Sequence, residues 1–131
     1  MWNEVQKNNS FSPRRGHAVI EYKDQVYVIG GEQCKGGDGN ICQQDENDMP
    51  IVTHLSDVWF TKDLIQWNLS TSNAKFGPRA FHAAVVFQDA MWIFGGGSPD
   101  CKYQVENNIT VHLCQDAFVS SDSKTWTTIF S

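Results

Sequence analysis

An internal repeat is the feature of this 131-residue sequence that most constrains its fold. Residues 13–18 read Pro-Arg-Arg-Gly-His-Ala and residues 78–83 read Pro-Arg-Ala-Phe-His-Ala, an offset of 65 residues. The same offset places the glycine pair at residues 30–31 opposite the pair at residues 95–96. A chain with such a period is built from similar supersecondary units, each of which buries its apolar face against a neighbour.

A second correspondence extends each unit to a later segment, with an offset of 59 residues. It aligns Asp57 with Asp116, and Trp67 with Trp126. The two offsets differ because the segment between the glycine pair and the later aspartate has a different length in each unit. Variable length is typical of a loop, so we expect a loop after each glycine pair.

Each unit contains four short segments rich in β-branched and aromatic residues, which predict strands. A polar pair follows the first segment in both units, Lys23-Asp24 and Gln88-Asp89, and suits a two-residue hairpin turn. No segment shows a sustained helical apolar period, so the sequence predicts an all-β chain. The expected strands are residues 17–22, 25–29, 57–61 and 66–69 in the first unit, and residues 82–87, 90–94, 117–120 and 125–129 in the second.

The order of these signals resembles the kelch repeat: Pro-Arg-x-x-His, a hairpin ending in Gly-Gly, an Asp-x-Trp or Asp-x-Phe strand, and then a single Trp. The resemblance implies a β-propeller like the central domain of galactose oxidase, in which each repeat is one four-stranded blade around a channel. Residues 1–131 would then be a partial kelch-type propeller. Residues 2–6 would be the outer strand of a preceding blade, residues 13–70 one blade and residues 78–130 the next.

Two blades do not close a ring, because propellers hold about four to eight. We therefore expect a fragment of a longer propeller, whose further blades cover the terminal faces. The alternative is a ring that several copies of the chain assemble. Residues 61–67 and 120–126 also resemble the Asp-box turn of sialidases, shortened by one residue, and in those propellers that turn is structural.

Composition excludes several function classes. The formal net charge is −5, which argues against nucleic-acid binding because that affinity comes mostly from clustered Lys and Arg. Hydrophobic residues make up 40% of the chain, enough for a packed core and too many for an intrinsically disordered chain. The longest apolar runs, residues 83–87 and 90–94, are far shorter than a membrane helix, so we expect no membrane segment.

Four cysteines occupy matched places, two in each unit, between the glycine pair and the third strand. Four cysteines allow three connectivities, and the pairs Cys34 with Cys42 and Cys101 with Cys114 have the shortest closures. The alternatives are four free thiols, or a zinc site for which no Cys-x-x-Cys or Cys-x-x-His pair is present. We expect the two local disulfides.

Three asparagines fit the glycosylation pattern Asn-x-Ser/Thr, namely Asn8, Asn68 and Asn108. Together with paired cysteines they favour an oxidising compartment, hence a secreted glycoprotein or one in the secretory pathway. The alternative location is the cytoplasm.

Two kinds of residue are candidates for a site. By resemblance to the kelch family, Arg14, Arg15 and Arg79 lie near a mouth of the channel and could bind an acidic partner. The alternative is a structural arginine between blades, paired with a carboxylate, because Arg suits both uses. His17 and His82 occupy one repeat position, which indicates a role in the fold.

The sequence favours a binding module that presents its loops to a protein or a carbohydrate partner. We expect no catalytic residues, metal or cofactor within it. The alternative is part of a propeller enzyme, galactose-oxidase-like or sialic-acid-processing, with its active site largely outside this chain. The tyrosines Tyr22, Tyr27 and Tyr103 match no copper-binding set, and no catalytic motif such as Gly-x-Ser-x-Gly is present.

Overall fold

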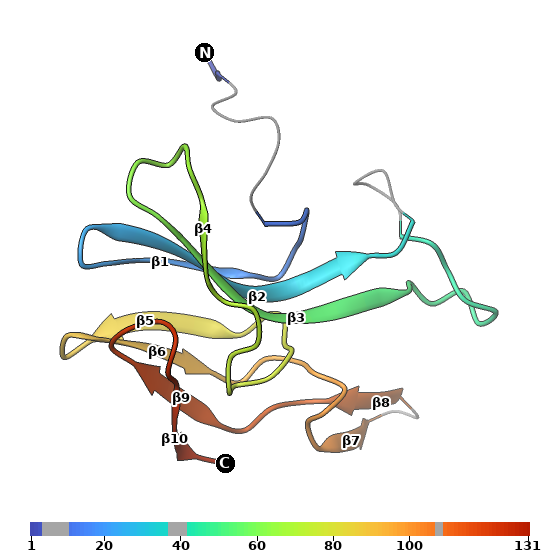
Figure 1. Ribbon diagram of the computed structural model, residues 1–131. Helices are drawn as coiled ribbons and strands as arrows, with labels where there is room; N and C mark the ends of the chain where they lie inside the picture. The colour runs from blue at the N-terminus through green and yellow to red at the C-terminus, as the bar shows by residue number, and fades with distance from the viewer. Residues whose placement is uncertain (4–10, 37–41, 107–108) are drawn as a thin grey trace.

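The computed structural model describes residues 1–3, 11–36, 42–106 and 109–131, which form two four-stranded antiparallel sheets stacked as layers (Figure 1). The first sheet runs β1 (Ala18–Tyr22), β2 (Gln25–Cys34), β3 (Val52–Thr61) and β4 (Asn68–Thr71) in chain order. The second runs β5 (Ala83–Phe87), β6 (Ala90–Phe94), β9 (Ala117–Ser120) and β10 (Thr127–Phe130). The described residues contain no helix, so the prediction of an all-β chain is confirmed.

All eight predicted strands are present, and the two polar pairs form the predicted hairpin turns. Lys23 and Asp24 have φ angles of 50° and 60°, and Gln88 and Asp89 have 49° and 56°. Two consecutive residues with positive φ are the geometry of the type I′ turn, whose twist matches that of the flanking strands. The polar pairs therefore set the register of both hairpins.

The segments after the glycine pairs differ from the prediction, because they are not simple loops. In the first sheet the ladder shifts register between Ile29 and Gly31 and then continues to the Cys34–Val52 pair. In the second unit a separate hairpin forms from β7 (Tyr103–Glu106) and β8 (Ile109–His112). Residues 52–55 and 109–112 contain the β-branched residues that favour strands. In Figure 1 these extensions point to the same side of the molecule.

The core lies between the two sheets. The first sheet contributes one face of β1, β2 and β3, and the second contributes one face of β5, β6 and β9. The segment that connects the sheets adds Ala74 and Phe76, and Trp126 packs edge-on against Phe76 with ring centroids 5.2 Å apart. The buried core residues are Tyr22, Tyr27, Ile29, Val58, Ala74, Phe76, Met91, Ile93, Phe118 and Trp126.

Hydrogen bonds also join the sheets. The backbone N–H of Gly31 donates to the carbonyl of Arg79 at 2.8 Å, and the N–H of Arg79 donates to the carbonyl of Leu55 at 3.1 Å. The Tyr22 hydroxyl donates to the carbonyl of Asp89 at 2.7 Å. The backbone at Arg79 thus connects the second repeat to the first. The predicted strand at residues 2–6 falls largely on residues outside the described part of the chain.

Candidate functional site

Arg14 forms a buried ion pair within the first repeat. Its Nη1 and Nη2 atoms lie 2.6 and 2.9 Å from the two carboxylate oxygens of Asp57, and Nη1 also donates to the carbonyl of Gly30 at 3.0 Å. Only 1% of the Arg14 side chain is exposed. Burial raises the pKa of Asp57, but hydrogen bonds from Arg14 and Trp59 outweigh burial and hold that pKa below its ordinary value.

Arg79 repeats this arrangement in the second repeat. Its Nη1 and Nη2 atoms lie 2.7 and 3.0 Å from the carboxylate oxygens of Asp116, and Nη1 donates to the carbonyl of Gly95 at 2.9 Å. The side chain is 3% exposed and also donates to the carbonyl of Phe76. Two-point contacts of this kind fix geometry as well as charge.

These pairs place two of the three predicted binding residues inside the fold. The carboxylate partners match the alternative of a structural arginine, although each pair lies within one repeat. Neither guanidinium presents a donor to the surface. The same geometry in both repeats explains why these residue types recur at fixed spacing. In each repeat the arginine bonds both the aspartate carboxylate and the carbonyl of the first glycine of the pair.

Arg15 differs from the other two arginines because 53% of its side chain is exposed. Its Nε donates to Glu32 Oε1 at 2.8 Å, and the other oxygen of Glu32 lies 3.4 Å from His54 Nε2. The backbones of Arg15 and Glu32 exchange two hydrogen bonds of 2.9 Å, and Glu32 pairs with His54 across β2 and β3. We call these three side chains the charged row.

The charged row has no counterpart in the second repeat. The equivalent positions hold Ala80, Gly97 and Leu113, which are joined by the same type of backbone bridge. We call these three the apolar row. Residues that recur in both repeats maintain the fold, so residues that differ at one end of both sheets are the better candidates for a site. The sequence prediction did not include Glu32 or connect it with Arg15 and His54, although the departure from the repeat at these positions is visible in the sequence.

The two repeated histidines are in different surroundings. His82 is 7% exposed, and its Nε2 lies 3.0 Å from the carbonyl of Ile29 in the first sheet. Its Nδ1 is buried and has no hydrogen-bond partner among the described residues. Burial, and then the nearby Arg79 guanidinium, lower the pKa of His82 to about 4. His17 is exposed, and its pKa is lowered by partial burial and by Arg14. A neutral His82 therefore helps to join the two sheets.

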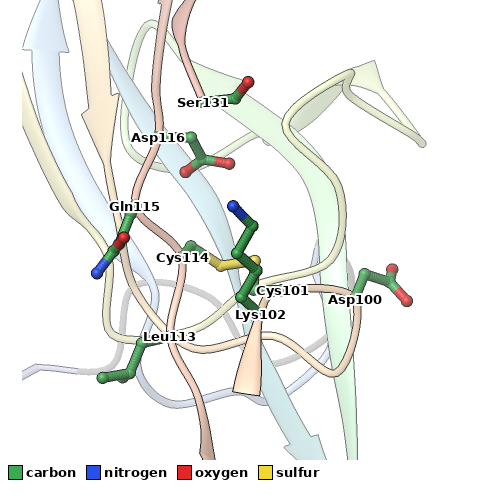
Figure 2. Close-up of a pocket in the computed structure, with 8 residues that line it drawn as sticks. All are labelled: Asp100, Cys101, Lys102, Leu113, Cys114, Gln115, Asp116 and Ser131. Carbon is green, nitrogen blue, oxygen red and sulfur yellow. A yellow bond between two sulfur atoms is a disulfide. The ribbon is translucent and has the colours of Figure 1, made fainter. Parts of the chain in front are cut away.

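The predicted disulfides are confirmed. Cys34 is bonded to Cys42 and Cys101 to Cys114, with Cα–Cα distances of 4.9 and 5.1 Å. The second disulfide borders a hollow of about 300 Å³ into which the Lys102 side chain extends, on the side where Asp116 and Ser131 lie (Figure 2). Asp116 is already bound by Arg79. The described residues contain no group of three or more His, Cys, Asp or Glu that could hold a metal ion.

The two Asp-box-like turns are the same structure twice. In the first, Asp63 Oδ1 accepts from the N–H groups of Ile65 and Gln66, at 2.8 and 2.9 Å. In the second, Asp122 Oδ1 accepts from Lys124 and Thr125, at 2.9 and 2.7 Å. These bonds lower the pKa of both carboxyl groups. Each turn leads into the outer strand of its sheet, which is a structural role.

Of the three predicted glycosylation sites, the described residues include one. Asn68 is exposed at the first position of β4, an edge strand. Asn8 and Asn108 lie outside the described residues. In the described part of the chain, no helix has the length and apolar character to cross a membrane.

No known protein-family model matches this chain. It is 28% identical over 112 residues to Ras guanine nucleotide exchange factor F of Dictyostelium discoideum, covering 85% of this chain and 8% of that protein. It is 28% identical over 121 residues to tRNA wybutosine-synthesizing protein 2/3/4 of Oryza sativa subsp. japonica, covering 92% and 10%. It is 27% identical over 104 residues to Tip elongation aberrant protein 3 of Schizosaccharomyces pombe, covering 79% and 8%. The chain thus spans about a tenth of the length of these curated relatives.

Proposed function

We propose that this chain is two blades of a kelch-type propeller, part of a longer propeller that serves as a binding module for a protein or glycan partner. The observation that carries the proposal is an equivalence between two sheet faces. The face of the second sheet that is exposed corresponds, residue by residue, to the face of the first sheet that is buried.

The buried face of the first sheet includes Ala18, Ile20, Tyr22, Tyr27, Ile29 and Phe60. The repeat offsets convert these positions to Ala83, Val85, Phe87, Trp92, Phe94 and Val119. These six lie on the face of the second sheet that points away from the core, as the pairs Val85–Trp92 and Ala83–Phe94 require. Val85, Phe87 and Phe94 are 45%, 58% and 38% exposed, so this face is apolar and uncovered.

This equivalence supports stacking in one direction. The two sheets meet through different faces, as successive blades do, and not through the same face as in a symmetric sandwich. A contact between different faces leaves one face of each kind uncovered at the two ends of the stack. Further sheets can therefore add in the same way until a ring closes. A further sheet of the same repeat is therefore the occupant that the apolar face of the second sheet fits.

The binding role is supported by the charged row. A rigid pair of sheets positions Arg15, Glu32 and His54 at the end where β2 and β3 extend beyond the glycine pair, and binding residues are typically placed on such a scaffold. The two disulfides support an oxidising compartment for this module. Function resides in such sites and not in the propeller fold itself.

The stacking part is tested by light scattering after size exclusion in non-reducing buffer. We expect the wild-type chain to associate with increasing concentration, as a ring-forming oligomer or as larger species. Val85→Lys, at the centre of the exposed face, should shift it toward monomer. Val105→Lys, on β7 and 63% exposed, is the matched control and should have no effect. A wild-type chain that stays monomeric at all concentrations would refute the stacking surface.

The binding part is tested by selecting twelve-residue peptides displayed on phage against the immobilised chain, together with a glycan array. The proposal expects binders that lose affinity for the variant Arg15→Glu. Failure to select any peptide or glycan, with the folded state verified by circular dichroism, would refute a binding role for this part of the propeller.

A further inference from the structure

Phe81 has a backbone conformation that its side chain disfavours. Its φ is 60°, in the left-handed region where a bulky L-residue is strained. Hydrogen bonds hold this conformation: the Phe81 N–H donates to the carbonyl of Gly16 at 2.7 Å, and Ala80 exchanges two backbone bonds with Gly97. At the equivalent position the first repeat has Gly16, with a φ of 66°. The fold therefore requires a positive φ here, and glycine would satisfy it without strain.

The positive φ of Phe81 does not belong to a tight turn of the kind that holds the other such residues. Most other non-glycine residues with positive φ in the described chain are polar residues of tight turns. The bulky exception is Leu64, which lies in an Asp-box-like turn whose backbone N–H groups donate to the side chains of Thr61 and Asp63. Phe81 has no such turn around it. The fold explains the positive φ at this position, but it does not explain why a bulky residue occupies it. Strained residues of this kind cluster at binding and catalytic sites.

The Phe81 ring is exposed and covers the residue next to Arg15 of the charged row. The residue is 69% exposed, so core packing does not explain the ring. A Cβ placed on Gly16 would be 3.1 Å from two ring atoms, so the ring covers Gly16, the residue next to Arg15. Arg15 uses its Nε for Glu32, and its two Nη groups have no acceptor among the described residues. An exposed apolar ring thus covers the residue next to an arginine whose Nη groups have no acceptor among the described residues.

We propose that Phe81 and Arg15 form a recognition site for an extended peptide segment of a protein partner, in which an apolar side chain adjoins an aspartate or glutamate. The apolar side chain packs on the Phe81 ring, and the carboxylate accepts hydrogen bonds from Nη1 and Nη2 of Arg15. Glu32 holds the guanidinium from its Nε side, which leaves the other edge directed to the ligand.

The chemistry of the site favours a peptide over a glycan. Leu113 of the apolar row, 45% exposed, adds aliphatic surface at the same end as the exposed Phe81 ring, and such surface suits the apolar side chains of a peptide. Aromatic residues and arginine are also the residues that contribute most at protein interfaces. This inference rests on the proposed binding function and adds the residues and the ligand class.

The test uses the displayed twelve-residue peptide library against the wild-type chain and three variants. Phe81→Gly gives the second repeat the residue of the first and removes both ring and strain, so the melting temperature should be unchanged or higher. Arg15→Gln removes the charge. Phe130→Ser is the matched control, because it removes another exposed phenylalanine, 56% exposed on the edge strand β10.

We expect the selected peptides to share an apolar residue within two positions of an acidic one. Their affinity, measured with the synthetic peptide, should fall at least tenfold for Phe81→Gly and for Arg15→Gln and by less than twofold for Phe130→Ser. Peptides that bind Phe81→Gly as well as wild type would overturn the inference and leave the binding module standing. Enrichment of glycans alone would also overturn it, and absence of any binder would refute both proposals.

Discussion

Protonation of His82 is expected to make the fold sensitive to mild acid. The Nε2 atom lies 3.0 Å from the Ile29 carbonyl, so in the neutral ring the proton is on Nε2 and Nδ1 carries a lone pair. A second proton would be placed on Nδ1, which is buried without an acceptor in the described structure and lies near the positive charge of Arg79. The folded state therefore resists protonation, and the unfolded state does not.

The size of the effect follows from the two pKa values. The pKa of His82 is about 4 in the folded chain, against 6.5 for an ordinary histidine. Below pH 6.5 the unfolded chain binds a proton that the folded chain does not, so the free energy of unfolding falls as pH falls, until pH reaches the folded pKa near 4. One pKa unit corresponds to about 1.4 kcal/mol, so the loss is about 2 kcal/mol at pH 5 and reaches about 3 kcal/mol near pH 4.

Urea unfolding at pH 7.5, 6 and 5, followed by tryptophan fluorescence, measures this loss. His82→Gln should remove most of the pH dependence in this window, because the amide can still donate to Ile29 and does not titrate. His17→Gln is the matched control from the first repeat, and it should retain most of the dependence because His17 is exposed. The aspartates with lowered pKa titrate below this window.

A wild-type free energy of unfolding that is the same at pH 7.5 and pH 5 would refute the assignment of a buried neutral histidine. Equal slopes for wild type and His82→Gln would attribute the acid sensitivity to another group.

Three further perturbations test the contacts that hold the sheets. Arg79→Gln leaves the Asp116 carboxylate without its partner and should cost about 3–5 kcal/mol in urea unfolding; a loss of about 1 kcal/mol or less, which is typical of a surface pair, would contradict the burial argument. Trp126→Ala should cost about 3–5 kcal/mol because the indole is 2% exposed in the core, and Trp67→Ala should cost less in the same assay. Replacing Cys101 and Cys114 together by serine should lower the free energy of unfolding by about 3 kcal/mol, and no change under non-reducing conditions would show that the disulfide does not constrain the unfolded chain.

The repeat in the sequence was sufficient to predict the strands of the two four-stranded sheets, their hairpin turns and the cysteine pairs. Each of these depends on residues that are close in the chain and that occur twice, so spacing carries the information. Lys23-Asp24 and Gln88-Asp89 are adjacent pairs with a local conformational preference, and they form turns where expected.

The site required contacts that spacing does not specify. Arg14 pairs with Asp57, 43 residues away, and the sequence did not distinguish this structural pair from a ligand-binding arginine. The strain at Phe81 depends on backbone bonds to Gly16 and Gly97, which only the arrangement of two sheets brings together. The β7–β8 hairpin was missed because length variation was taken to mean absence of regular structure.

The disulfide between Cys101 and Cys114 closes the base of the β7–β8 hairpin, just after β6 and just before β9. The covalent link that holds the end of β6 near the start of β9 therefore passes through this disulfide, and its length does not depend on the number of residues between the two cysteines. A longer insertion there adds closure entropy only slowly, and only within its own loop. Residues 103–111 are thus a position where unrelated sequence can be grafted, or acquired in evolution, without changing the register of β6 on β9.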